Sequence, residues 1–122
     1  MFKTAKRLVA DVPPTEYLAP TSGVNYVVGG ALKLANGKAA IAAGTDKAEF
    51  ICRGPINDDG LVPAMRVTNL IEFETTAPSN LAVGTIVTLS PDGLSVTATA
   101  TGGTFKVTCM CEDLLVRGIF IA

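Results

Sequence analysis

The chain has 122 residues and a mass of 12.6 kDa, a length typical of a single domain. Its formal net charge is −1, which disfavours nucleic-acid binding because that requires clustered positive charge. Histidine is absent, so Ser-His-Asp and Cys-His nucleophiles, histidine general bases and histidine-containing zinc sites are excluded. We therefore expect that the protein is not an enzyme and that it binds neither a metal ion nor a cofactor.

Residues 1–23 are predicted to form an extended arm. Pro13, Pro14 and Pro20 interrupt helices and β ladders, and the apolar residues follow no period. Two interpretations stay open: a flexible terminus, or a segment that becomes ordered against a partner, which its apolar content favours. The apolar run at 8–10 is too short for the core of a signal peptide, and no stretch could span a membrane. We expect a soluble protein synthesised in a cytoplasm.

Residues 24–122 are predicted to form a β domain. Residues 31–35 and 38–41 flank Asn36-Gly37, a pair that tolerates the positive φ values of a type I′ turn and so predicts a hairpin. Residues 49–53 read as a short strand. The alanine-rich stretch 39–48 is compatible with a short helix, and no window carries a full helical stripe.

A longer, half-buried strand is predicted next. One face holds its apolar side chains: Met65, Val67, Ile71 and Phe73. The other face holds its polar side chains: Arg66, Thr68, Glu72 and Glu74. This alternation is typical of a strand that covers a core on one side.

Three further strands are predicted to form an antiparallel meander, over residues 85–89, 94–101 and 104–109. A last strand covers 114–121. Fourteen threonines, twelve valines and seven isoleucines support these assignments, because branched side chains fit a pleated sheet. The expected fold is all-β, a small antiparallel β-sandwich or barrel of about seven to nine strands.

The three cysteines, Cys52, Cys109 and Cys111, are an odd number and do not indicate a disulfide framework. Cys109 and Cys111 would lie on one face of a strand with Cα atoms about 7 Å apart, which is unfavourable for a bond between them. We expect three reduced thiols.

Other candidate sites are weak. Asp58-Asp59 before Gly60 lacks the alternating spacing of a calcium loop, and Glu72 with Glu74 is more typical of a solvated face than of an acid–base pair. Gly29-Gly30 lacks the strand–loop–helix context of a phosphate-binding loop.

The apolar C-terminal stretch has two open interpretations. Residues 118–122 pair within the domain, or Ile119, Phe120 and Ile121 form a subunit contact in a homo-oligomer.

Several segments resemble the small capsid decoration, or cement, proteins of tailed phages and prophages. They are residues 1–18 (MFKTAKRLVADVPPTEYL), 30–34 (GALKL), 36–39 (NGKA), 83–89 (VGTIVTL) and 92–94 (DGL). The similarity lies in the general arrangement, an arm followed by a β domain with glycines at its turns, and it covers most of the chain.

The resemblance implies a β-tulip-like fold and a structural role without catalysis. It implies a virion protein that binds the outer capsid surface, with the major capsid protein as partner and a trimer as the favoured homo-oligomer. An arm of this kind would contact the shell through its apolar and basic side chains: Phe2, Lys3, Lys6, Arg7, Leu8, Val9, Tyr17 and Leu18.

Two alternatives remain. One is a head–tail connector, tail-tube or fibre-associated subunit. The other is a carbohydrate-binding β module, which the scarcity of aromatic side chains disfavours because sugar rings stack on them.

Overall fold

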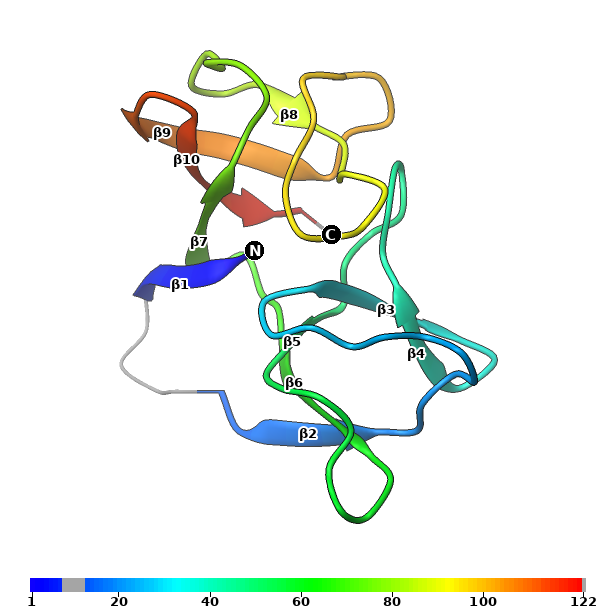
Figure 1. The fold of residues 1–122 in the computed structure, drawn as a ribbon. Coiled ribbons are helices and arrows are strands. Elements are labelled where there is room, and N and C mark those ends of the chain that lie inside the picture. The colour runs from blue at the N-terminus through cyan, green and yellow to red at the C-terminus, as the bar shows by residue number, and fades with distance from the viewer. Residues whose placement is uncertain (8–12, 122) are drawn as a thin grey trace.

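The computed structural model describes residues 1–7 and 13–121, and this part of the chain holds ten strands and no helix. The strands form two antiparallel sheets of five strands each, consistent with a small β-sandwich (Figure 1). The predicted all-β class is therefore confirmed. The strand number exceeds the expected seven to nine, and the helix considered over 39–48 does not form.

The first sheet, in the upper half of Figure 1, has the order β1-β7-β10-β9-β8. Its strands are β1 (Lys3–Arg7), β7 (Ile71–Thr76), β10 (Leu115–Phe120), β9 (Phe105–Glu112) and β8 (Ile86–Val87). The second sheet has the order β2-β6-β5-β3-β4. Its strands are β2 (Thr15–Leu18), β6 (Val62–Arg66), β5 (Phe50–Cys52), β3 (Ala31–Ala35) and β4 (Lys38–Ile41).

The second sheet curls until its two edges meet. The chain after β2 forms a parallel bridge from Pro20 to Ala39 on β4, and Ala39 N–H donates to the Ala19 carbonyl at 2.8 Å. The Tyr26 hydroxyl donates to the Ala39 carbonyl at 2.6 Å inside this curl. A small apolar cluster that includes Leu32 and Phe50 fills the interior.

The main core lies against the first sheet and is built around four phenylalanines. Phe120 contacts the rings of Phe2, Phe73 and Phe105 at centroid distances of 5.0, 5.4 and 5.2 Å, in tilted or edge-on arrangements. All four side chains are buried. Aromatic pairs favour this geometry, so the cluster contributes more than its buried area alone.

The hairpin predicted at Asn36-Gly37 is confirmed. β3 and β4 pair from Ala35↔Lys38 to Leu32↔Ile41, and the two turn residues have φ values of 53° and 75°. Both values are those that a type I′ turn requires.

The long strand predicted around residues 65–74 is wrong in one respect, because it is two strands. β6 ends at Arg66 in the second sheet and β7 begins at Ile71 in the first. The Thr68 hydroxyl accepts the Leu70 N–H at 3.2 Å, which replaces ladder bonds with a local turn. The alternation holds on both sides of this turn, since Met65 and Ile71 are both buried.

The predicted meander is also wrong in its middle strand. Residues 94–101 form no named strand, although Thr97 N–H donates to the Thr88 carbonyl at 2.9 Å and Leu89 forms a bridge with Val96. The Thr88 and Thr97 hydroxyls lie 2.6 Å apart, and Thr97 Oγ1 also accepts the Thr99 N–H. The two segments therefore lie side by side with backbone and threonine side-chain contacts but without a regular ladder, and β8 pairs with β9.

The structure does not show a separate N-terminal arm. β1 pairs with β7 at the edge of the first sheet, and β2 pairs with β6 at the edge of the second. An edge strand needs one partner and only a few inward side chains, so these short stretches pair without any period visible in the sequence.

Candidate interaction surface

The expected binding residues of the N-terminal segment lie in different environments. Lys3, Lys6 and Arg7 are exposed on β1, whereas the Phe2 side chain is only 3% exposed and belongs to the main core. Phe2 N–H also donates to the Gly29 carbonyl at 2.8 Å. Phe2 therefore anchors β1 and is not available to a partner in this conformation.

β1 presents a basic outer edge. It pairs on one side only, and Lys3 and Lys6 face Glu74 and Glu72 on β7. A bulge between Thr4 and Lys6 interrupts the register. Lysines and bulges protect an edge strand against unwanted pairing, and they also leave cations where an acidic surface could meet them.

On β2, Tyr17 is 58% exposed, while Leu18 packs against the smaller cluster. Glu16 beside it forms an ion pair with Arg66 on β6 at 2.9 Å. The hydrogen bond from Arg66 lowers the pKa of the Glu16 carboxyl. The Arg66 guanidinium also lies 4.7 Å from the Phe50 ring centroid on β5. Through Glu16, Arg66 therefore links β2 to the rest of its sheet, and the Tyr17 side chain remains exposed.

Leu8 and Val9, the two remaining residues expected to bind, lie outside the described residues.

The C-terminal stretch follows the first of its two interpretations within this chain. Phe120 is 3% exposed in the main core, and Ile121 N–H donates to the Thr104 carbonyl at 2.9 Å. Ile119 faces Lys106 on β9 and is half-buried, as is Ile121. These residues pair internally, and only the partly exposed isoleucines retain surface for a subunit.

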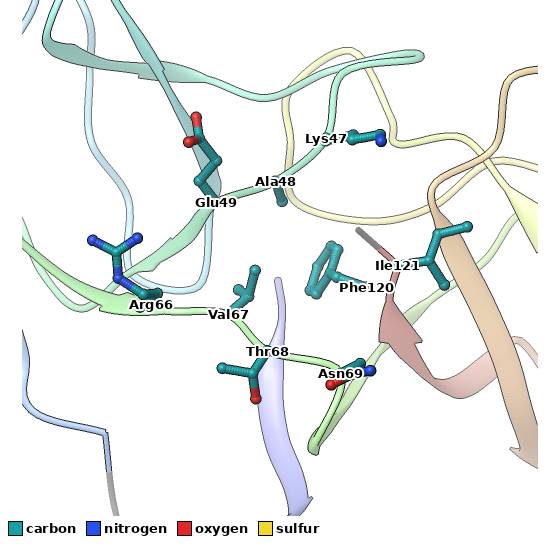
Figure 2. A pocket seen from close by; sticks show the side chains of 9 residues that line it. All are labelled: Lys47, Ala48, Glu49, Arg66, Val67, Thr68, Asn69, Phe120 and Ile121. Atoms are coloured by element: carbon teal, nitrogen blue, oxygen red, sulfur yellow. The ribbon is translucent and has the colours of Figure 1, made fainter.

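A cavity of about 490 Å³ opens where the two sheets meet (Figure 2). Figure 2 shows Phe120 at its centre, with Ala48 and Val67 nearby and the charged side chains of Glu49 and Arg66 directed away from Phe120. Glu49 Oε2 accepts the Leu34 N–H at 2.8 Å. Among the described residues, apolar side chains line the centre of the cavity and charged side chains surround its opening. The Glu49 carboxylate already accepts a backbone hydrogen bond.

The weaker candidates are explained by local structure. Glu72 Oε2 accepts a hydrogen bond from Thr108 at 2.8 Å and Glu74 pairs with Arg117 at 3.2 Å, so the two carboxylates have separate partners. Within residues 1–7 and 13–121 no group of three or more acidic, cysteine or histidine residues is placed to hold a metal ion.

The glycine pair and the acidic turn also have structural roles. A Cβ on Gly29 would lie 2.6 Å from Met1 Cβ, so this glycine permits close packing of the chain. The Asn57 side chain accepts the backbone N–H groups of Asp59 and Leu61, each at 3.0 Å, and shapes the turn that contains Asp58.

Two features were not predicted from the sequence. Cys111 Sγ lies 3.4 Å from Cys109 Sγ, an approach of the two side chains that the expected Cα spacing did not indicate. Leu114 has a φ of 60°, a conformation that bulky residues rarely adopt, at the β9–β10 turn. Neither carries a signal that sequence alone displays, because each depends on a local departure from regular strand geometry.

The fold and its surfaces define a small all-β protein of two antiparallel sheets with a basic edge strand. Comparison with known protein families, with curated proteins and with solved structures finds no match for this chain. The described residues contain no helix with the length and apolar character needed to cross a membrane.

Proposed function

We propose that this chain is a virion structural protein that binds the outer surface of a phage capsid and stabilises the shell without catalysis. Its partner would be the major capsid protein, and it would act as a homo-oligomer, with a trimer favoured. The resemblance of the sequence to capsid decoration proteins motivates the proposal.

The observation that carries it is the exposed basic edge of β1. Lys3, Lys6 and Arg7 project from a strand that Phe2 fixes in the core. A strand that is already paired loses less conformational entropy on binding than an unfolded segment does, so fewer contacts are needed. Weak contacts repeated over many copies on a shell, and over several subunits of an oligomer, add up through multivalency.

The first test is the copy number of this chain relative to the major capsid subunit in purified particles of the virus that encodes it, measured by quantitative mass spectrometry. A ratio near one to one supports the proposal. A handful of copies would favour the alternative of a connector or tail subunit. Absence from the particle would refute a virion role.

The second test addresses the binding edge. We compare a Lys3→Gln, Lys6→Gln, Arg7→Gln variant with a matched control, Lys38→Gln, Arg53→Gln, Lys106→Gln, whose three cations are also exposed. Exposed ion pairs contribute about 0.2–1 kcal/mol each, so losing three should weaken binding to empty expanded shells about threefold to a hundredfold. Equal binding by both variants would exclude β1 as the contact.

A further inference from the structure

Cys109 and Cys111 lie at a β-bulge that brings their side chains together. The consecutive residues Leu115 and Val116 on β10 face Glu112 and Met110 on β9, so Cys111 is an additional residue in β9. In a regular strand the Cα atoms of residues i and i+2 are about 7 Å apart, and here the two side chains lean together so that their sulfur atoms lie 3.4 Å apart. The two thiols are therefore close enough to react with each other, at a bulge where strand geometry departs from the regular form on which the expectation of unlinked thiols depended.

Both thiols can be reached from solvent. Cys109 is exposed and Cys111 is partly buried, whereas Met110 between them packs against the main core. Arg117 faces Cys109 directly on β10, and it is held by Glu74 at 3.2 Å. Thiol chemistry requires that the attacking sulfur be accessible, and both sulfur atoms meet this condition.

The two thiols are not equivalent. The Cys111 thiol donates a hydrogen bond to Cys109 Sγ, and Cys109 is the more exposed of the two. Partial burial raises the pKa of the Cys111 thiol, and the neighbouring Cys109 raises it further. The more exposed Cys109 is therefore expected to react first, and Cys111 Sγ, 3.4 Å away, is positioned to follow.

We propose that Cys109 and Cys111 form a redox-active dithiol, which closes reversibly to an intrastrand disulfide on reaction with a small-molecule disulfide. This inference does not depend on the proposed capsid function.

The exchange proceeds in two balanced steps. The Cys109 thiolate attacks one sulfur of the small-molecule disulfide, and the other half leaves as a thiolate that takes up a proton. Cys111 then releases its proton to water and attacks Cys109 Sγ, which expels the second half as a thiol. Two protein thiols are oxidised to one disulfide, and one small-molecule disulfide is reduced to two thiols.

Cys52 supplies an internal control. It is 1% exposed, and its thiol donates to the Gly54 carbonyl at 2.9 Å. Burial raises the pKa of the Cys52 thiol, so both access and thiolate formation are hindered. The folded protein should therefore react only at Cys109 and Cys111.

The reduced 122-residue chain is incubated with oxidised glutathione at about 1 mM. This concentration does not exceed the effective concentration of Cys111 at Cys109, so the second thiol can compete with glutathione for the first. Intact mass is recorded over time, and the remaining thiols are alkylated after unfolding. Cys109→Ser and Cys111→Ser are treated in parallel, with circular dichroism to check that each is folded.

The wild-type chain should lose the mass of two hydrogens and keep one alkylatable thiol, which peptide mapping places at Cys52. Dithiothreitol should restore all three. Cys111→Ser should accumulate the glutathione adduct to a level at least about tenfold higher than the wild type, because the tethered second thiol is missing. Cys109→Ser should react more slowly than Cys111→Ser.

Three results would overturn the proposal. They are a wild-type chain that retains three free thiols, one that stops at the glutathione adduct, and one that forms disulfide-linked dimers instead of an internal bond.

Discussion

Replacing Phe2 with alanine tests whether the N-terminal segment is part of the folded domain or a separate arm. The Phe2 side chain is 3% exposed, and its ring lies 5.7 Å from Phe105 and 5.0 Å from Phe120. If β1 is part of the domain in solution, this substitution opens a hole in the main core. If the segment is detached, it changes little.

The expected loss can be worked out from these contacts. Truncation of a buried phenylalanine to alanine costs about 3–5 kcal/mol, and its aromatic contacts account for about 0.5–1.5 kcal/mol of this. Phe2 precedes an edge strand that can fray, so we expect the lower end, about 3 kcal/mol. The whole domain has a free energy of unfolding of about 6–18 kcal/mol at this length. A single side chain should therefore remove a large share of it.

The assay is urea denaturation followed by far-ultraviolet circular dichroism, since the chain has no tryptophan. Tyr17→Ala is the matched control, because it removes another aromatic ring from the N-terminal segment at a site that is 58% exposed. We expect the control to change the free energy of unfolding by less than about 0.5 kcal/mol. A Phe2→Ala variant as stable as this control would show that the reasoning from the core is mistaken and would favour a detached arm.

Four smaller predictions follow from backbone geometry and charge. Gly118→Ala should destabilise by about 3 kcal/mol, because its Cβ would meet a backbone carbonyl of β9 and a buried aromatic ring. Gly37→Ala should cost only about 1 kcal/mol in the same urea assay, since its φ is 75° but nothing lies within 4 Å of the added Cβ. Leu114→Asn should stabilise by about 0.5 kcal/mol, because asparagine tolerates the φ of 60° better, and an unchanged urea midpoint would contradict this. The hydrogen bond from Lys33 holds the pKa of Asp46 below its usual value. The stabilisation from this pair is therefore present above the unfolded-state pKa of about 4 and is lost as the pH falls through the folded-state pKa. Asp46→Asn should remove this pH dependence, which changes the free energy of unfolding on the acid side by less than about 1 kcal/mol.

The parts of the fold that sequence predicts are those in which local chemistry decides the conformation. Asn36-Gly37 requires no tertiary partner to favour a type I′ turn, and the strands on either side of it follow at once. The inward positions of Met65 and Ile71 were also predictable, because alternation reports burial whichever sheet a strand joins. The apolar run near the C-terminus identified the last strand, β10, to within one residue at each end.

The parts that sequence missed depend on partners distant in the chain. Alternation cannot show that the strand carrying Met65 ends before Ile71 and that the chain then changes sheets, because the period continues through the turn. The N-terminal segment has too few inward residues to display a period, yet Phe2 completes an aromatic cluster whose other members come from β7, β9 and β10. A bulge of one residue in β9 likewise leaves no mark in the composition.

The charge pattern around β1 constrains how this edge could bind a shell. Lys3 and Lys6 lie opposite Glu74 and Glu72, and Arg117 is paired with Glu74, so these five side chains together carry an excess of one positive charge. Such a face exerts little long-range attraction, and contact through it would depend on the position of each cation at short range. The variant that replaces Lys3, Lys6 and Arg7 removes three positive charges, two of them from this set, and leaves Arg117 against Glu72 and Glu74 with a net negative charge. The glutamine variant therefore reverses the sign of the local charge and also removes contacts. If β1 contacts the capsid, both changes should weaken binding.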